Sequence, residues 1–249
     1  MGLTALYFGS FNPPHKGHVA VAEYVVREGF ADEVWMVVSP QNPHKKVADL
    51  APEQARLAMV REAVEEVAGV EVCDVEFSLP RPSYTVCTID HLRRLYPERE
   101  FAIFGGGDVA ATIATWRQGA RLVSENKILI YPRNEHDSFG EPFVMLSEAP
   151  RLNISSTQVR EAIARGEEWK SMLPEKVGQY IKQHKLYMQQ DIEKELALGK
   201  EAFARSEFGP AKNHFGAVLR LDSSNEEAAQ WLEMIEDILA FRHKDYYNP

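Results

Sequence analysis

The 249-residue sequence has few cysteines, no long apolar run and no excess of basic residues. Its two cysteines, Cys73 and Cys87, lack the Cys-x-x-Cys spacing of a zinc or redox site, so we expect free thiols in a reducing compartment. No apolar stretch approaches the roughly 18 residues that cross a bilayer, and the N-terminus lacks the pattern of a signal peptide. We therefore expect a soluble, cytoplasmic protein without membrane contact.

The net charge is −9, from 28 basic and 37 acidic residues. Proteins that bind nucleic acids generally carry a basic surface, so this balance argues against a nucleic-acid partner and restricts any phosphate binding to a local site. Hydrophobic residues make up 45% of the chain and charged residues 26%, as in ordinary globular proteins. The chain can therefore fill a sizeable core.

Short apolar runs rich in β-branched and aromatic residues alternate with segments of helical spacing. The expected strands are residues 3–8, 33–38, 70–77, 101–104, 127–131 and 143–146, and the expected helices between them are residues 18–28, 52–67, 85–95 and, more weakly, 108–124. This alternation favours a doubly wound α/β fold, in which helices cover both faces of a parallel sheet. Ligands of such folds bind beyond the carboxyl ends of the strands.

Two further helices, opening near Ser155 and at Pro174, complete a first domain that we expect to span residues 1–187. Residues 188–249 contain no expected strand, and from Gln189 on they carry 7 basic and 12 acidic residues, which indicates a small all-α appendage. Its spacing resembles one tetratricopeptide unit, on the residues Leu198, Gly199, Phe208, Ala211, Phe215 and Leu219. Because about three such units make a continuous core, we favour packing against the first domain or a second subunit over a peptide-binding groove.

The most specific signal is the segment Gly-Ser-Phe-Asn-Pro-Pro-His-Lys-Gly-His at residues 9–18, which follows the first strand and leads into a helix. It gathers His15, Lys16 and His18 at the helix N-terminus, where the helix dipole disfavours positive charge. Such clustering is reasonable if an anion such as phosphate binds there.

A second candidate anion site is Ile-Ser-Ser-Thr-Gln-Val-Arg at residues 154–160. Its hydroxyl groups can cap a helix while the free amides and the Thr157 hydroxyl face an anion. Side chains lean toward a helix N-terminus, so Arg160 can reach back to grip phosphate oxygens. Taken alone, this segment is better explained as a plain helix cap followed by a surface arginine, because serines that cap helices are common.

Together the two segments resemble the nucleotidyltransferase superfamily with a Rossmann-like fold, and most closely its bacterial nicotinate-nucleotide adenylyltransferases. The similarity covers about residues 1–187, with further matches at Asn42-Pro43-His44-Lys45, Ser83-Tyr84-Thr85, Asp108, Trp116, Tyr131-Pro132-Arg133, Leu173-Pro174, Tyr180-Ile181 and Leu186-Tyr187. Two features depart from the family pattern: the run Gly105-Gly106-Gly107, where relatives have a single glycine and a small residue, and Asn12 in place of a commoner aspartate.

The resemblance implies transfer of AMP from ATP to nicotinate mononucleotide, with Mg²⁺ carried by the ATP phosphates and no metal-binding residue in the protein. It implies catalytic roles for His15, His18, Lys45 and Arg160, with His18 stabilising the α-phosphate. The implied ATP-binding residues are Gly9, Ser10, Phe11, His15, His18, Ile154, Ser156, Thr157 and Arg160. The implied acceptor-binding residues are Lys45, Tyr84, Thr85, Asp108 and Trp116.

Three alternatives stay open at this point. The same phosphate-binding residues would serve nicotinamide mononucleotide or phosphopantetheine as acceptor. Tyr84, Thr85 and Trp116 suit a pyridine ring and argue against phosphopantetheine, and between acid and amide we favour the acid. The third alternative is a non-catalytic nucleotide-binding scaffold whose helical tail recruits a partner; the cations expected on both sides of the α-phosphate argue against it.

Overall fold

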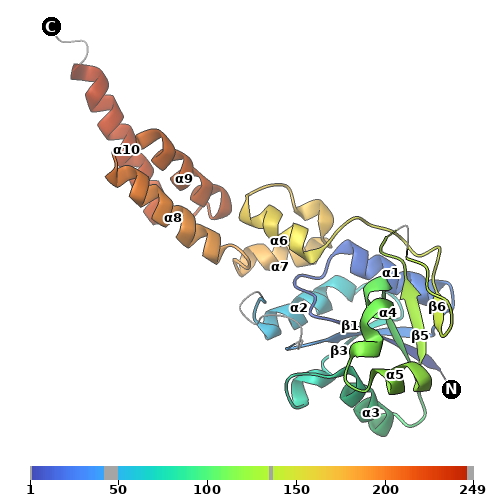
Figure 1. The fold of residues 1–249 in the computed structure, drawn as a ribbon. Coiled ribbons are helices and arrows are strands. Elements are labelled where there is room, and N and C mark those ends of the chain that lie inside the picture. The colour runs from blue at the N-terminus through green and yellow to red at the C-terminus, as the bar shows by residue number, and fades with distance from the viewer. Residues whose placement is uncertain (1, 42–49, 135–136, 246–249) are drawn as a thin grey trace. The chain divides into compact units, whose positions relative to one another are not determined.

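The structure, a computed structural model, describes residues 2–41, 50–134 and 137–245 (Figure 1). Contacts divide the chain into two compact units. The first comprises Met1–Ser156 and Met172–Gly178, and the second comprises Thr157–Ser171 and Gln179–Pro249. The domain boundary that we expect near residue 187 stays a prediction.

A six-stranded parallel sheet forms the centre of the first unit. Its strands are β1 (Leu3–Gly9), β2 (Glu33–Val38), β3 (Val70–Cys73), β4 (Glu100–Gly106), β5 (Lys127–Tyr131) and β6 (Phe143–Met145), in the spatial order β3-β2-β1-β4-β5-β6. The chain moves outward from β1 to β3 and then returns to place β4 beside β1. This reversal is the switch point at which doubly wound sheets bind their ligands, and it confirms the expected Rossmann-like fold.

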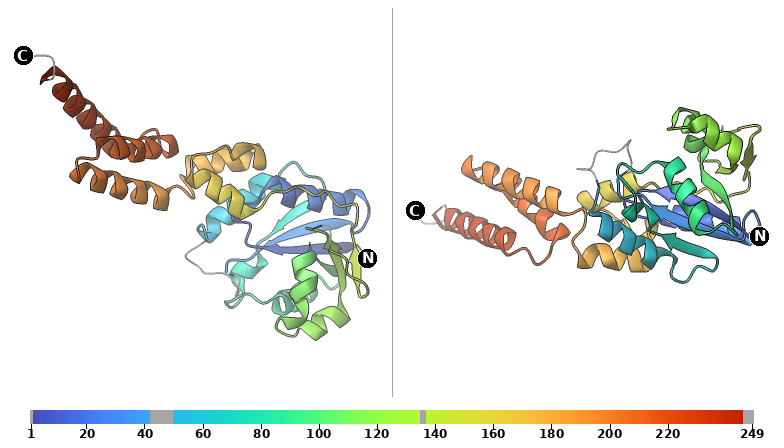
Figure 2. Two further views of the ribbon diagram at one scale, coloured as in Figure 1. Left: turned by 45° about the horizontal axis from the view of Figure 1, so that its top comes forward. Right: turned by 90° about the horizontal axis from the view of Figure 1, so that it is seen from below.

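Helices cover both faces of this sheet. Helices α1 (Lys16–Arg27) and α2 (Glu53–Val64) lie on one face, and α3 (Thr85–Leu95), α4 (Gly107–Thr112) and α5 (Gly119–Glu125) lie on the other (Figures 1 and 2). On the α3 side, Val86, Ile89 and Leu92 follow one another at helical spacing and pack against apolar strand residues such as Ile103 and Ile128. The apolar periodicity of the sequence thus becomes the core that fixes the strand ends.

Two expected elements are interrupted in the structure. The strand expected over residues 70–77 ends at Cys73, and the 3₁₀ helix Val75–Ser78 (η2) follows it and buries Glu76. The single helix expected over residues 108–124 is divided into α4, the 3₁₀ helix Ile113–Thr115 (η3) and α5, and Gln118, which precedes α5, adopts a left-handed backbone with φ of 54°. Both breaks lie in segments that follow the carboxyl end of a strand, β3 for the first and β4 for the second.

The three glycines at residues 105–107 do not interrupt the fold. Strand β4 continues through Gly106, and α4 begins at Gly107. The departure from the family pattern therefore falls on the junction between a strand and the helix that follows it.

The regular secondary structure of the second unit's described residues is all helical. It contains α6 (Ser156–Ala164) from its second residue, the C-terminal part of α7 (Glu175–Gln183), α8 (Gln189–Ala204), α9 (Phe208–Leu221) and α10 (Glu226–Asp245). The buried side chains of α8, α9 and α10 are apolar: Ile192, Ala202, Ala211, Phe215, Val218, Ala228 and Ile235. The expected all-α character of residues 188–249 is thus confirmed in the described part, and the tetratricopeptide resemblance stays a prediction.

Neither the helices nor the cysteines of the described residues contradict the expectations from composition. No described helix combines the length and apolarity needed to span a bilayer. Both cysteines are free thiols; Cys73 is buried, which raises its pKa to about 11, and Cys87 is exposed.

Candidate active site

The turn after β1 is built around Gly9. A Cβ atom at this position would lie 2.7 Å from the Phe11 ring, so the ring can pack over the strand end only because residue 9 is glycine. Phe11 itself has a left-handed backbone, with φ of 46°, a strained conformation that concentrates at functional sites. Ser10 and Phe11 are both buried. The segment between β1 and α1 is therefore a fixed structure.

His18 is held in one orientation by its neighbours. The backbone N–H of His15 donates a hydrogen bond to His18 Nδ1 over 3.1 Å, and the two imidazole rings stack with centroids 3.6 Å apart. The Phe11 ring packs edge-on against His18 at 5.2 Å. Because Nδ1 accepts a hydrogen bond, the neutral ring carries its proton on Nε2. His18 can therefore offer an N–H donor to a ligand.

His15 lies beneath His18 and is 7% exposed. Burial, and secondarily the positive charge of Arg133, lower the pKa of His15 to about 4. The ring is therefore neutral at pH 7 and does not add the positive charge that the sequence suggested at this helix start. Its structural contribution is to orient His18.

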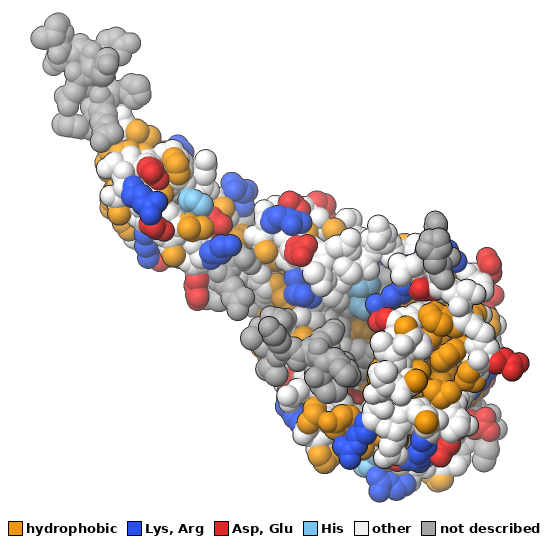
Figure 3. All heavy atoms as spheres, viewed as in Figure 1, with side chains coloured by type: hydrophobic (Ala, Val, Ile, Leu, Met, Phe, Trp, Pro, Cys, Tyr) orange, Lys and Arg blue, Asp and Glu red, His pale blue; other side chains and the backbone are white. Residues whose placement is uncertain are grey.

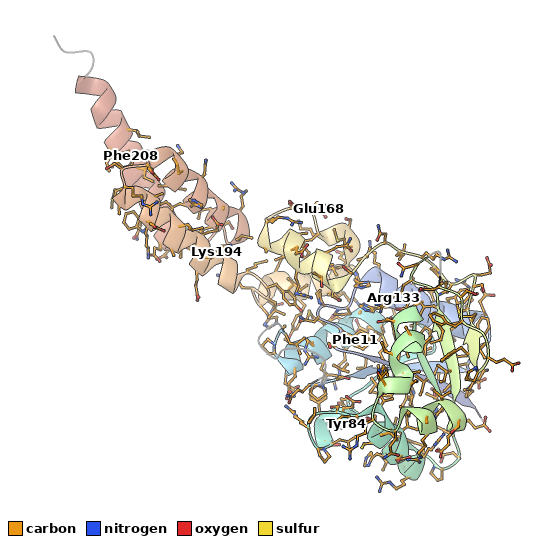
Figure 4. All side chains as sticks on the ribbon, in the orientation of Figure 1. Phe11, Tyr84, Arg133, Glu168, Lys194 and Phe208 are labelled. Atoms are coloured by element: carbon orange, nitrogen blue, oxygen red, sulfur yellow. The ribbon has the colours of Figure 1, made fainter. Side chains whose placement is uncertain are left out.

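A cavity of about 500 Å³ lies in the first unit at the carboxyl ends of β1 and β4. It brings together many of the residues expected from the sequence: Gly9, Ser10, Phe11, His18, Tyr84, Thr85, Asp108, Trp116 and Ser156. Figure 4 labels three of its lining residues, Phe11, Tyr84 and Arg133, which come from three separate segments. Residues expected to bind the donor and residues expected to bind the acceptor thus share one cavity.

Ser156 joins this cavity through the segment before α1. Its hydroxyl group donates a hydrogen bond to the backbone carbonyl of Pro13 over 2.8 Å. Ile154, in contrast, does not line the cavity; its N–H donates to the carbonyl of Leu152.

Three expected site residues lie outside the first unit's described part. Lys45, with the rest of residues 42–49, is outside the described residues. Thr157 and Arg160 belong to the second unit, where Arg160 Nη2 donates to Thr157 Oγ1 over 3.3 Å. The convergence of Arg160 with His18 on one triphosphate stays a prediction.

Two arginines to which the sequence motifs assign no role also line the cavity and contribute positive charge. Arg133 follows β5, lies 3.2 Å from Asp108 and donates to the Tyr131 hydroxyl group. Arg117 lies over the Tyr84 ring, with Cζ 4.7 Å from the ring centroid. The position of Arg133 just beyond a strand end was a usable signal, whereas Arg117 follows from the broken helix and had none.

A third arginine, Arg56, acts on the backbone. It is 1% exposed and donates to four carbonyl oxygens, those of Ser10 (2.8 Å), Ser39 (2.7 Å), Pro40 (2.7 Å) and Ala51 (3.0 Å). The Asn12 side chain accepts a hydrogen bond from the N–H of Ala51 over 3.0 Å. The residue that departs from the family's aspartate therefore binds backbone in this chain.

Four buried side-chain atoms have no hydrogen-bond partner within the part of the chain that the structure describes: Ser10 Oγ, His15 Nδ1, Glu76 Oε2 and Ser83 Oγ. Three of these residues line the cavity, and the fourth stacks on His18. Leaving a buried polar atom unsatisfied costs about 1–3 kcal/mol. Such a concentration indicates a site built for a polar ligand.

The described residues contain no group of three His, Cys, Asp or Glu side chains that could hold a metal ion. The carboxyl groups that line the cavity belong to Glu76 and Asp108, and Asp108 is paired with Arg133.

Comparison with protein families places most of the first unit in a known group. Residues 6–162 match the family described as cytidylyltransferase-like. A probable nicotinate-nucleotide adenylyltransferase of Bacteroides fragilis is 45% identical over 168 residues, which are 66% of this chain and 84% of the relative. One of Flavobacterium johnsoniae is 38% identical over 187 residues, which are 73% of this chain and 97% of the relative.

Solved structures show the same fold. Nicotinic acid mononucleotide adenylyltransferase of Plasmodium falciparum, complexed with NaAD, superposes with a TM-score of 0.64 at 21% identity and covers 75% of this chain and 98% of its own. A second structure of that enzyme, complexed with APC, gives a TM-score of 0.62 at 22% identity, with the same coverage of both chains.

Proposed function

The chain belongs to the cytidylyltransferase-like family and, within it, to the nicotinate-nucleotide adenylyltransferases, and from this premise we propose how its cavity works. The reaction transfers AMP from ATP to nicotinate mononucleotide and yields deamido-NAD and pyrophosphate. The observation that carries the assignment of the site is the set of unsatisfied polar atoms around one cavity at the switch point of the sheet.

The reaction needs no covalent intermediate with the protein. A phosphate oxygen of nicotinate mononucleotide attacks the α-phosphorus of ATP, and the bond from that phosphorus to the bridging oxygen breaks as pyrophosphate leaves. The protein has to align the two nucleotides and stabilise the negative charge at the α-phosphate.

His18 fits the second task. His18 lines the cavity together with Gly9 and Ser10, and the hydrogen bond to its Nδ1 fixes its orientation before any ligand binds. A preorganised donor of this kind stabilises the transition state because no reorganisation is needed during the reaction. We assign His15 to the support of His18, and the phosphates of ATP to Gly9, Ser10 and His18.

The departing pyrophosphate would be held at the start of α6. Ser156 is at the cavity, and Thr157 and Arg160 follow it directly in the chain. Lys45 completes the proposed set next to the reacting phosphates. Mg²⁺ would reach the site with the ATP phosphates, because it retains most of its water and needs few protein ligands. The free thiols of Cys73 and Cys87 suit the cytoplasmic location that belongs to this proposal.

The acceptor ring would lie against Tyr84 and Trp116, with its carboxylate near Thr85 and Arg117. The backbone amides at the start of α3 and the guanidinium group of Arg117 both favour a negatively charged substituent. This combination supports the acid over the amide. Arg117→Gln should lower kcat/KM for nicotinate mononucleotide about tenfold and leave the weak use of nicotinamide mononucleotide nearly unchanged, as measured by steady-state kinetics with both acceptors.

The decisive experiment is to incubate the purified protein with ATP and Mg²⁺ plus nicotinate mononucleotide, nicotinamide mononucleotide or phosphopantetheine, and to record pyrophosphate release. We expect rapid release with the first acceptor and its conversion to deamido-NAD. Faster release with either other acceptor would reassign the substrate. ATP binding without release from any acceptor would instead favour the non-catalytic scaffold.

A further inference from the structure

Glu76 and Ser83 form a polar corner in the wall of the cavity, here named the Glu76–Ser83 corner. The 3₁₀ helix that interrupts the expected third strand turns Glu76 inward, where it is 1% exposed, and Ser83 is 8% exposed. Glutamate is rarely buried so deeply without a paired charge. A ligand in the cavity would supply the hydrogen-bond partners that this corner lacks.

One half of the Glu76 carboxyl group is already used. Oε1 accepts a hydrogen bond from Thr88 Oγ1 of helix α3 over 2.8 Å, which fixes the position of the carboxyl group. Oε2 and Ser83 Oγ have no hydrogen-bond partner among the described residues. Burial raises the pKa of Glu76, and the neighbouring hydroxyl groups of Thr88, Ser39 and Ser83 act in the opposite direction. Additional donors from a ligand would stabilise the ionised form further.

The chain itself places this corner on the acceptor side of the proposed site. Ser83 directly precedes Tyr84 and Thr85, and Thr88 lies one turn further along α3. The residues proposed for the ATP phosphates come instead from the end of β1, the start of α1 and the start of α6. We therefore expect the acceptor nucleotide, rather than ATP, to contact the Glu76–Ser83 corner.

A carboxylate oxygen accepts hydrogen bonds, so its partner must be a donor. The phosphate and the ring carboxylate of nicotinate mononucleotide are acceptors, and its ring nitrogen carries no hydrogen atom. The donors of this molecule are the 2′- and 3′-hydroxyl groups of its ribose. A ribose hydroxyl group can also accept a hydrogen bond from Ser83 Oγ. The ribose would thus give a partner to both unsatisfied atoms of the corner.

We propose that Glu76 and Ser83 bind the ribose diol of the acceptor nucleotide and so select an acceptor that is a ribonucleotide. This inference rests on the proposed function, because it takes nicotinate mononucleotide as the acceptor. The ribose lies between the phosphate and the ring, so the corner also sets the distance between the attacking oxygen and the Tyr84 ring.

The test compares wild type and Glu76→Gln with nicotinate mononucleotide and with its 2′-deoxy and 3′-deoxy analogues. Glutamine keeps the shape of the side chain and the bond to Thr88 but replaces the charged acceptor. In wild type, loss of at least one hydroxyl group should raise the acceptor KM about tenfold or more, as for a hydrogen bond to a charged group. In Glu76→Gln the KM for the natural acceptor should rise similarly, and removal of that hydroxyl should add little further loss.

Glu71→Gln, an exposed glutamate on β3, is the matched control and should behave as wild type. Ser83→Ala is the second variant; it removes one hydroxyl group and should give a smaller rise in the acceptor KM. The KM for ATP and the loss on replacing ATP by 2′-deoxy-ATP should be the same in all variants.

Equal losses on removing the hydroxyl in wild type and Glu76→Gln would overturn the proposal, as would an effect confined to ATP and 2′-deoxy-ATP. A wild type that releases no pyrophosphate with nicotinate mononucleotide would refute the proposed function itself, and this inference with it. If wild type turns over nicotinate mononucleotide and Glu76→Gln has the same acceptor KM, the inference is refuted and the proposed function stands.

Discussion

The two units of the chain differ in the polar side-chain groups that they bury. In the first unit, four buried polar atoms have no partner among the described residues, and all belong to the cavity or the histidine stacked beneath it. In the second unit, the side chains buried among α8, α9 and α10 are apolar, and Phe215 stacks on Trp231 with ring centroids 5.5 Å apart. The first unit thus combines an apolar core with unsatisfied polar atoms at one cavity, whereas the buried side chains of these three helices serve packing alone.

The charged surface of the second unit agrees with this difference. Basic and acidic side chains are interspersed on its visible face (Figure 3). Several of them pair across helices, as in Lys200 with Glu227 and Lys212 with Glu236. Exposed pairs of this kind contribute little stability each, so the stability of these helices depends on their apolar contacts.

The largest effect is expected for His18→Ala, a substitution at the cavity of the first unit. It should lower kcat about 10²- to 10³-fold with a modest change in ATP binding, because it removes a donor that acts on the transition state. The matched variant in the other unit is His214→Ala, whose ring bonds Glu195 at 2.7 Å and which should leave kcat unchanged. Steady-state kinetics of both variants check this; near wild-type turnover of His18→Ala would contradict it.

A second prediction concerns the pH dependence of stability. The pKa of His15 is about 4 in the folded protein and about 6.5 unfolded, so between these values only the unfolded chain binds the proton. Stability should therefore fall as the pH falls from about 6.5 to about 4, by up to about 3 kcal/mol from this residue. Denaturant unfolding of wild type and His15→Gln across this range tests it. Equal slopes in the two proteins would show that His15 is not the cause.

The third prediction tests the side-chain packing of the helical unit. In α8, a Cβ on Gly199 would lie 2.6 Å from the Phe215 ring, whereas a Cβ on Gly209 of α9 would meet nothing within 4 Å. Gly199→Ala should therefore destabilise the helical unit by about 1–3 kcal/mol. Gly209→Ala should be neutral or slightly stabilising, since alanine favours helices. Thermal unfolding followed by circular dichroism measures both effects, and kcat should not change in either variant.

The smallest expected effect is that of removing residues 189–249. The relative from Flavobacterium johnsoniae is matched over 97% of its length by 73% of this chain, so the family's fold does not need such a tail. We expect kcat and both KM values of the truncated protein to stay within about twofold of wild type. A large loss of activity in a protein that remains folded would assign the tail a role in the reaction.

The sequence predicted the parts of the fold and site that depend on local pattern. The apolar runs marked all six strands, and the glycine-to-histidine segment after the first strand marked His18 and its surroundings. It did not reveal Glu76, because the apolar run continued through residue 77 and only tertiary packing breaks it at Asp74. Arg117 was equally hidden, since its position depends on the left-handed backbone of Gln118. Breaks set by three-dimensional context leave no periodic signal.

The four hydrogen bonds from Arg56 to backbone carbonyl groups have a consequence for the geometry of the proposed site. A guanidinium group is rigid and planar, so the carbonyls of Ser10 and of Ser39 and Pro40 are held at a constant spacing. Ser10 belongs to the proposed donor site, and Ser39 and Pro40 precede Lys45 in the sequence. Arg56 does not line the cavity, yet it fixes the spacing between two segments of the proposed site. A lysine in its place has three N–H donors and would leave at least one of the four carbonyls without a donor.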